Sequence, residues 1–355
     1  MKVVHVDSAR TWRGGQNQVL QTALGMARRG HEVKLACRAA GELEARAREH
    51  GLDVVPLAFG GDIAPGATWG LRRLLRRFAP DVVHVHDPHA VSAGVLAAWR
   101  MPGRLVATRR VDFHLRNALS VTKYTRCARV LAVSRAIDRV LRDDGLPPEL
   151  IRVVHEGVPD REPRSGGREA LAGAGIPADA RLIGNVAALT DHKDHATLLD
   201  AFDIVSRADE RAWLAIAGDG ELRGPLEEKR RALGLERCVF LGFRRDLDAL
   251  IPAFDVFCLA SHMEGLGTSL LDAMCFRRPI VATEAGGIPD AVEHGLNGLL
   301  SPVRDAPRLA AHLLAVLGDP EGAAALGAAG RLRFEERFTT DRMVDATLAV
   351  YGEVA

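Results

Sequence analysis

Short runs of β-branched and apolar residues alternate, in the first half of the chain, with stretches whose apolar residues recur at helical spacing. KVVHVD opens the chain, and after SARTWRGGQNQ the segment VLQTALGMARRG is apolar at positions 19, 20, 23, 24 and 27. Further apolar runs follow as HEVKLAC, LDVVPLA, DVVHVH, RLVATRR and RVLAVS. This alternation predicts a parallel sheet covered by helices. Residues 1–160 are therefore predicted to form one doubly wound α/β domain.

The same alternation starts again after a linker. Residues 157–167 combine three glycines, two prolines and several charges, a composition typical of linkers. Strand patterns then recur as RLIGNVAAL, AWLAIAGDGE, CVFLGF and VFCLAS, separated by the helix patterns HATLLDAFDIVSRA and LRGPLEEKRRALG. We predict a second α/β domain over 161–335 and a terminal helix over 336–355 that could pack on either domain, including back on the first. Ligands of such sheets bind at the carboxyl ends of strands, so the two domains are expected to face a cleft.

Composition excludes several protein classes. The 355 residues are 47% hydrophobic and 26% charged, and no run of eighteen apolar residues occurs, so a membrane-spanning protein is not expected. The N-terminus lacks the apolar core of a secretory signal, which favours a cytoplasmic protein. Five scattered cysteines without a C-x-x-C pair indicate reduced thiols and no zinc site.

The charge is divided unevenly along the chain. Residues 1–160 hold 25 Lys and Arg against 16 Asp and Glu, a net of +9, and the remainder holds 22 against 30, a net of −8. The first half is therefore expected to meet an anionic partner, either a phosphate-bearing acceptor or a membrane surface.

One segment of that half, LRRLLRRFAP, predicts an amphipathic basic helix. Leu71, Leu74, Leu75 and Phe78 share one face, and Arg72, Arg73, Arg76 and Arg77 share the other. We favour a helix packed on the sheet with a solvated basic face. Peripheral contact with anionic lipid at the inner face of a membrane stays open as an addition.

Candidate chemistry concentrates in SHMEGLGTSLLDAMCF, where a glycine-rich loop joins a strand to a helix. The loop places Glu264 at the carboxyl end of the strand. Gly265 and Gly267 leave room for an anion to reach the backbone N–H groups of residues 267–269 at the helix start. Asp272, in the first turn, could then bind ribose hydroxyls, so the segment fits a nucleotide diphosphate. The alternative for Asp272 is a capping box with Ser269.

The order of the second-domain motifs resembles glycosyltransferase family 4, whose members are retaining enzymes with the GT-B fold. The motifs are E-G-x-G, a following helix with a carboxylate, PIVAT, GGIPD and G-x-N-G-L-L, and first-domain segments such as PDVVHVHDPHA occur in the family's order. The resemblance implies that Glu264 contacts the donor sugar, Asp272 the ribose and Lys193 the diphosphate. The sequence departs from the family pattern in two places. Asp272 stands where the family has the second Glu of its paired acidic motif, and Ala188 stands where an Arg is expected.

Further site residues follow from the same resemblance. The implied catalytic set is Glu264, Lys193 and Arg110, because Arg109 or Arg110 stands where many members carry a His. Solvent-facing arginines at a strand end are the alternative for that pair. The donor-binding set adds Gly14, Gly15, Gly218, Phe243, Arg244, Gly265, Leu266, Gly267, Thr268, Ser269 and Asp272, although Gly14, Gly15 and Gly218 could equally mark turns. The acceptor side is assigned Arg13, His86 and Arg109, and Arg13 and Arg110 are also candidates for the missing cation.

A histidine-rich segment, HVHDPH, places His84 and His86 on one strand face, followed by Asp87 and His89. A metal cluster is the less favoured interpretation, since no further ligands are evident in the sequence and the family resemblance implies catalysis without metal. We expect no cofactor.

These observations predict a metal-independent retaining glycosyltransferase that moves a hexose-type sugar from a nucleotide-diphosphate donor to a saccharide or lipid-linked saccharide. The cell-envelope polysaccharides are the expected setting, and nucleic acid is not an expected partner. The alternative is a sugar-nucleotide-binding protein with little transfer activity, motivated by Ala188 and Asp272. A nicotinamide-dependent dehydrogenase is disfavoured because WRGGQNQ, not G-x-G-x-x-G, follows the first strand.

Overall fold

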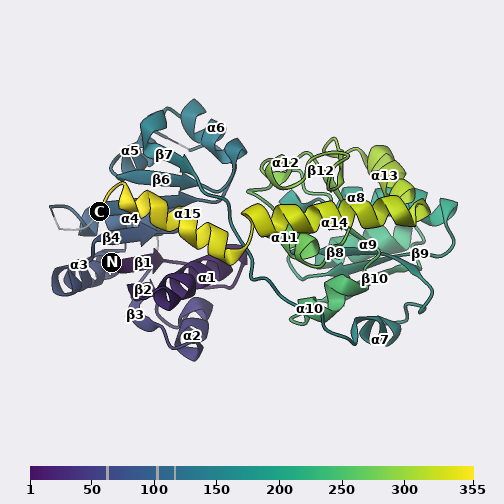
Figure 1. The fold of residues 1–355 in the computed structure, drawn as a ribbon, viewed down its shortest axis with the longest axis horizontal. Helices are drawn as coiled ribbons and strands as arrows, with labels where there is room; N and C mark the ends of the chain where they lie inside the picture. Colours follow the sequence, from purple (N-terminus) through teal and green to yellow (C-terminus); the bar gives the residue numbers. More distant parts are fainter. Residues whose placement is uncertain (61–63, 101–103, 116) are drawn as a thin grey trace. The chain divides into compact units, whose positions relative to one another are not determined.

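The chain divides into two units, each built around one parallel β-sheet (Figure 1). The computed structural model describes residues 1–60, 64–100, 104–115 and 117–355. Unit 1 comprises residues 1–159 and 339–355, and unit 2 comprises residues 160–338. The two predicted Rossmann-like sheets are confirmed.

The sheet of unit 1 runs in the order β3-β2-β1-β4-β5-β6-β7. Its strands are β1 (Lys2–Asp7), β2 (Glu32–Arg38), β3 (Asp53–Leu57), β4 (Val82–Val85), β5 (Arg104–Arg109), β6 (Arg129–Ala132) and β7 (Ile151–Val153). Its helices are α1 (Gly14–Arg28), α2 (Glu42–Glu49), α3 (Pro65–Phe78), α4 (Pro88–Ala97), α5 (Ala118–Thr125), α6 (Arg135–Asp143) and α15 (Thr340–Gly352). The strand order reverses between β1 and β4, which makes the carboxyl ends of these strands the place for a ligand.

The sheet of unit 2 runs in the order β10-β9-β8-β11-β12-β13, with the corresponding reversal between β8 and β11. Its strands are β8 (Arg181–Val186), β9 (Ala212–Ala217), β10 (Cys238–Gly242), β11 (Val256–Leu259), β12 (Ile280–Thr283) and β13 (Leu299–Ser301). Its helices are α7 (Gly167–Ala172), α8 (His195–Ala208), α9 (Arg223–Ala232), α10 (Leu247–Leu250), α11 (Thr268–Cys275), α12 (Ile288–Ala291), α13 (Ala306–Gly318) and α14 (Pro320–Arg337).

Burial explains why the central strands carry apolar residues on both faces. Every residue of β4, β11 and β12 is buried, because helices cover both sides of each sheet. The five cysteines are likewise buried, with free thiols. No helix within the described ranges is long and apolar enough to cross a membrane.

The terminal helix α15 belongs to unit 1, where it packs on α1. Gly25 of α1 permits this approach, because a Cβ at that position would lie 2.5 Å from Cγ2 of Val344. Tyr351 is fully buried near the end of α15. The last residues of the chain thus complete the core of the first domain.

Helix α1 begins earlier than the sequence suggested. Gly14 and Gly15 are its first two residues, so the alternative that these two glycines mark a turn is wrong. The side chain of Gln16 explains the extension, since its Oε1 accepts a hydrogen bond from the backbone N–H of Arg13 at 3.2 Å. A side chain that satisfies a backbone donor at a helix start stabilises the additional turn.

The prediction that α3 packs on the sheet is confirmed. Leu71, Leu75 and Phe78 are buried, while Leu74 is only half-buried. The arginines lie on the opposite side, with Arg73, Arg76 and Arg77 exposed and Arg72 half-buried.

Candidate active site

The loops that follow β8 and β11 are joined at the reversal point of the unit 2 sheet. The backbone N–H of His262 donates to the carbonyl oxygen of His192 at 3.0 Å. The His262 ring also lies 3.1 Å from a carboxylate oxygen of Asp191. Two loops distant in sequence are therefore held together at the edge where ligands of parallel sheets bind.

Lys193 and Glu264 form an ion pair in this place. They are 71 residues apart in sequence, and their side chains are 16% and 11% exposed. Ser261 donates its hydroxyl to Glu264 Oε2 at 3.2 Å, and the N–H of Gly287 donates to the Glu264 carbonyl at 2.9 Å. The pair is thus fixed from three loops and presents a cation and a carboxylate at one point.

Helix α11 begins directly after this carboxylate. Gly267 has φ of +86°, a left-handed conformation that favours glycine, and Leu266 beside it is buried and anchors the turn. Thr268 and Ser269 are half-buried. N–H groups in the first turn of a helix have no intrahelical acceptor, so this end suits an anion. Gly265 to Ser269 thus form the loop and the start of α11, and their role in donor binding stays a prediction.

Asp272 is the fifth residue of α11, and the capping-box alternative is wrong because the helix begins at Thr268 rather than after Ser269. The carboxylate forms an ion pair with Arg161, which comes from the linker. Burial raises the pKa of Asp272 to about 6, although Arg161 opposes the shift. Arg161 was not anticipated from the sequence, because nothing in the linker's composition singles it out. The ribose role of Asp272 stays a prediction.

Glycines after β9 support the loop that carries Lys193. A Cβ on Gly218 would lie 1.8 Å from the carbonyl oxygen of Ala187, and one on Gly220 would lie 2.4 Å from that of Leu189. The loop also contains Ala188, which is exposed. Gly218 therefore acts on the site through backbone packing.

The loop after β10 carries Phe243 and Arg244, two residues of the predicted donor-binding set. Phe243 is 62% exposed. Arg244 donates to Asp246, with Nε 2.8 Å from Oδ1, and this bond raises the pKa of Arg244. The arginine is therefore oriented by its own loop, and the aromatic ring lies open to solvent.

A buried polar pair beneath the Lys193 loop was missed by the sequence analysis. His195 Nε2 lies 3.1 Å from Asn185 Oδ1, and Asn185 donates its amide N–H to the carbonyl oxygen of Cys258 at 2.8 Å. These contacts connect α8, β8 and β11 below the reversal point. Burial lowers the pKa of His195 to about 4, assisted by the charge of Lys193. The imidazole is therefore neutral at physiological pH.

We expect the free energy of unfolding to depend on pH through His195. The pKa is lower in the folded state, so the stabilising contribution is present above pH 6.5 and is lost as the pH falls toward 4. Replacing His195→Gln removes this titration, and the stability difference between wild type and variant should shrink by about 3 kcal/mol from pH 7 to pH 4. Chemical denaturation of both proteins across that range measures it. A difference that stays constant with pH would contradict the buried neutral assignment.

In unit 1 the carboxyl ends of β1, β4 and β5 bring another set of predicted residues together. Arg110 donates from Nε to Glu156 at 2.8 Å and from Nη1 to the carbonyl oxygen of His86 at 3.1 Å. Gly15 lies against the same side chain, with its ideal Cβ position 3.6 Å from Arg110 Cδ. Arg109 is 3% exposed and donates to the carbonyl oxygen of Phe113 at 2.6 Å. The solvent-facing alternative for both arginines is therefore wrong, and Glu156 is a partner that the sequence did not reveal.

His84 and His86 belong to a buried cluster with His5, a third histidine that the sequence analysis missed. Their ring nitrogens lie within 4.8 Å of one another, close enough for a metal ion to be considered. Each ring already has hydrogen-bond partners: His84 contacts Tyr351 and Thr108, both at 2.6 Å, and His5 contacts His86 at 2.9 Å. Burial lowers the pKa of all three histidines, which are neutral. The described contacts favour a hydrogen-bond network that supports Arg110.

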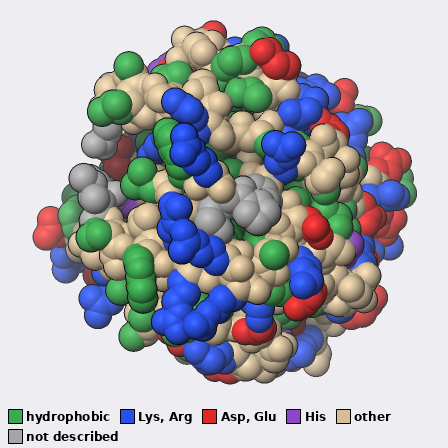
Figure 2. All heavy atoms as spheres, turned by 90° about the vertical axis from the view of Figure 1, so that its left-hand side faces the viewer, with side chains coloured by type: hydrophobic (Ala, Val, Ile, Leu, Met, Phe, Trp, Pro, Cys, Tyr) green, Lys and Arg blue, Asp and Glu red, His purple; other side chains and the backbone are tan. Residues whose placement is uncertain are grey.

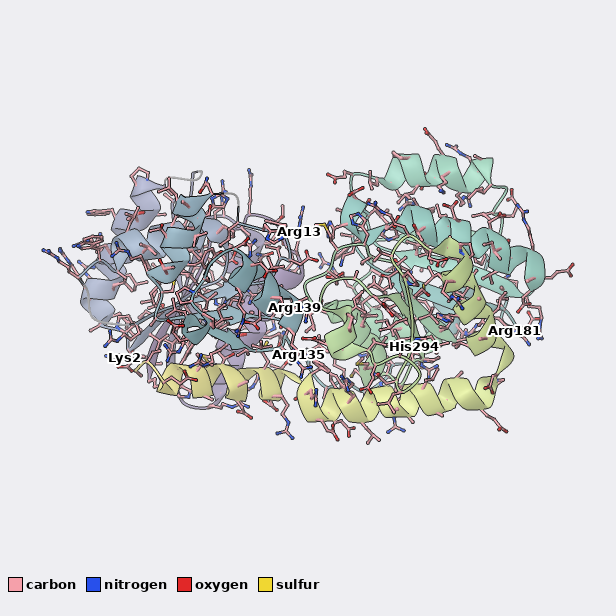
Figure 3. The ribbon with its side chains drawn as sticks, turned by 90° about the horizontal axis from the view of Figure 1, so that it is seen from above. Lys2, Arg13, Arg135, Arg139, Arg181 and His294 are labelled. Carbon is pink, nitrogen blue, oxygen red and sulfur yellow. The ribbon has the colours of Figure 1, made fainter. Side chains whose placement is uncertain are left out.

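Exposed arginines mark the same end of unit 1. Arg13 precedes α1, whereas Arg135 and Arg139 lie in the first turns of α6, and Figure 3 shows the three at one end of the unit. Arg135 and Arg139 were not predicted from the sequence as site residues, because a helix pattern alone does not show at which end of the sheet their side chains lie.

Comparison with known proteins matches both units to glycosyltransferase families. The model described as "Glycosyltransferase Family 4" matches residues 12–162, and the model described as "Glycosyl transferases group 1" matches residues 168–333. The chain belongs to the glycosyltransferases of family 4.

Curated proteins named D-inositol 3-phosphate glycosyltransferase are among the relatives of the chain. The protein from Saccharomonospora viridis is 28% identical over 387 aligned positions, which cover 96% of this chain and 89% of the relative. The protein from Streptomyces bingchenggensis is 30% identical over 305 positions, covering 77% of this chain and 66% of the relative.

Among solved structures, the chain is similar to Anabaena Alr3699/HepE in complex with UDP-glucose. The TM-score is 0.89 at 21% identity, and the match covers 99% of this chain and 100% of that one. At this identity the likeness establishes the fold, which is GT-B.

Proposed function

We propose that this glycosyltransferase is a retaining, metal-independent enzyme that transfers a hexose-type sugar from a nucleotide-diphosphate donor bound by unit 2. The observation that carries the proposal is the Lys193–Glu264 ion pair at the reversal point of the unit 2 sheet, beside the start of α11. A lysine, a carboxylate and a helix N-terminus at one point suit a sugar diphosphate, because they match its two negative phosphates and its hydroxyl groups.

The residues have separate roles in the proposed reaction. Lys193 and the N–H groups at the start of α11 would stabilise the negative charge on the departing diphosphate as the anomeric C–O bond breaks. Glu264 would bind hydroxyl groups of the sugar. The acceptor oxygen would form the new bond on the face that the diphosphate leaves, and its proton would pass to a diphosphate oxygen. Configuration is then retained without a protein nucleophile or a metal ion.

For the acceptor, we propose a saccharide or lipid-linked saccharide bound by unit 1, with Arg13, His86 and Arg109 on that side and Arg110 in the catalytic set. The names of the two relatives make an inositol phosphate a further acceptor to test. The proposal includes a cytoplasmic location, a role in envelope polysaccharides and peripheral contact of unit 1 with an anionic membrane.

A donor panel tests the proposal. The melting temperature of the protein is measured with UDP, GDP and ADP sugars and CMP sugars, and the stabilising donor is then followed for transfer and nucleotide release. UDP-glucose is tried first, since it is the ligand named for Alr3699/HepE. One stabilising donor with release of its nucleotide, and a product of unchanged anomeric configuration by NMR, is the expected result. Activity that chelators abolish would contradict metal independence.

The second candidate function is a sugar-nucleotide-binding protein with little transfer activity. Two observations favour it. The exposed Ala188 stands where the family resemblance implies an arginine, and the carboxylate of Asp272 is already paired with Arg161. Donor-dependent stabilisation without nucleotide release, in the presence of saccharide acceptors, would support this function instead.

Ala188→Arg separates the two candidates. The residue is exposed on the loop that carries Lys193, so an arginine can enter without a clash and add a second cation for the diphosphate. We expect transfer to stay intact or to rise by up to roughly 100-fold, the value of one added charge-stabilising group. Steady-state kinetics measure the change, and Ala188→Gln is the control of similar length without charge. A fall in activity in the arginine variant alone would contradict the placement of the diphosphate.

A further inference from the structure

Three successive helices of unit 1 contain no acidic residue. The sequences of α3, α4 and α5 hold neither Asp nor Glu, whereas α3 alone contains four arginines. Unit 1 has 26 Lys and Arg against 18 Asp and Glu, a net charge of +8. The flank formed by α3 and α4, which pack against each other, is therefore more basic than the unit that carries it.

The outer side of α3 combines this charge with an aromatic ring. Trp69 is 66% exposed, and it lines a hollow together with the four arginines of the helix, Arg72, Arg73, Arg76 and Arg77. These five residues recur at helical spacing and so share one face. The guanidinium of Arg73 lies 5.8 Å from the centre of the Trp69 ring. A basic face that only contacts water gains nothing from an exposed tryptophan, so Trp69 indicates a binding partner for this face.

The end of α4 adds further exposed apolar side chains. Leu96 is 54% exposed, and Trp99, just beyond the helix, is 53% exposed. The guanidinium of Arg126, which follows α5, lies 5.9 Å from the centre of the Trp99 ring. Figure 2, which faces this end of the molecule, shows Lys and Arg side chains gathered with hydrophobic ones among them. We call Trp69, the four arginines of α3, Leu96 and Trp99 the α3–α4 face.

We propose that the α3–α4 face is the docking surface for a bilayer containing anionic phospholipid. Guanidinium groups bind lipid phosphates through paired N–H donors, and tryptophan rings favour the boundary between headgroups and acyl chains. Leu96 and the two tryptophans supply apolar contact that a purely electrostatic partner, such as a soluble polyanion, would leave exposed. The α3–α4 face would make the membrane contact that is part of the proposed function. The proposal depends on the proposed function only where it supposes that the acceptor is lipid-linked.

Vesicle sedimentation of the full chain tests the proposal. The vesicles are phosphatidylcholine alone or phosphatidylcholine mixed with phosphatidylglycerol, each at low and high salt. The variants are Arg73→Gln/Arg76→Gln/Arg77→Gln and Trp69→Ala/Trp99→Ala. A matched control, Arg231→Gln/Arg304→Gln/Arg308→Gln, removes the same charge from exposed positions of unit 2.

We expect wild type to sediment with the anionic vesicles only, and high salt to weaken the binding. The triple variant of α3 should bind roughly 100-fold more weakly, the control triple less than threefold more weakly, and the tryptophan variant should lose the binding that persists at high salt. Equal binding by wild type and the α3 variant, or no sedimentation of wild type, would overturn the proposal.

Two further measurements keep the outcomes distinct. Thermal unfolding of each variant shows whether the fold is intact, which is expected because all substituted side chains are exposed. Stabilisation by the donor sugar nucleotide reports on the donor site, to which no residue of the α3–α4 face is assigned. If the α3 variant loses vesicle binding and keeps its donor response, the surface is supported. If wild type binds vesicles and no donor, the proposed function fails while the docking surface stands.

Discussion

Lys193→Ala should abolish measurable glycosyl transfer, with kcat/KM reduced roughly 1000-fold. Lys193 supplies the ammonium at the reversal point of the unit 2 sheet, and removal of one group that stabilises developing charge costs about 100- to 1000-fold. Steady-state kinetics with the stabilising donor measure the effect. Donor affinity should weaken as well, because the same cation would contact the diphosphate before the reaction.

The control for this prediction must separate lost chemistry from lost stability. Glu264 is 11% exposed, so Lys193→Ala leaves a nearly buried carboxylate without this cation, which can cost about 3 kcal/mol. The double variant Lys193→Ala/Glu264→Ala removes that penalty and should recover stability without recovering activity. Lys229→Ala is the matched lysine, since it pairs with Asp200 at 2.7 Å between α8 and α9. Transfer retained by Lys193→Ala would show that the diphosphate binds elsewhere.

Substitution of Glu264 should be nearly as damaging. We expect Glu264→Ala to abolish transfer and Glu264→Gln to reduce kcat/KM roughly 100-fold. A neutral amide forms no ion pair with Lys193, and its oxygen accepts weaker hydrogen bonds from sugar hydroxyls. Kinetics with the donor and with its free nucleotide as inhibitor measure the two effects. Inhibition by the nucleotide should change less than transfer, since Glu264 is assigned to the sugar.

Glu335→Gln provides the comparison for this carboxylate. Glu335 pairs with Arg331 at 2.6 Å in α14 of the same unit, and its side chain is 45% exposed. Its loss should leave transfer unchanged within twofold. Equal effects of Glu264→Gln on nucleotide inhibition and on transfer would place Glu264 at the nucleotide rather than at the sugar.

Much of the architecture could be predicted because it follows from local patterns. Alternating strand and helix patterns with turn residues between them predicted parallel sheets, and α8 begins and ends where the periodicity of HATLLDAFDIVSRA does. The loop with Glu264 and Gly267 could be placed at a carboxyl edge because a strand precedes it and a helix follows it. Local prediction was wrong at α1, where a Gln16 side chain, not glycine content, decides where the helix begins.

The sequence by itself determined two α/β domains with parallel sheets. It also determined the cation, carboxylate and glycines expected at a diphosphate, since the order of strand and helix patterns along the chain shows which residues follow the end of a strand. Only the tertiary structure decided which charges meet. Lys193 with Glu264, Asp272 with Arg161, and Arg110 with Glu156 are pairs between segments distant in sequence, and no local pattern contains them. The extent of burial is another property of the assembled fold, because neighbouring elements determine how much water each side chain meets. Burial keeps the histidines around His84 neutral, whereas Trp69 stays exposed among arginines.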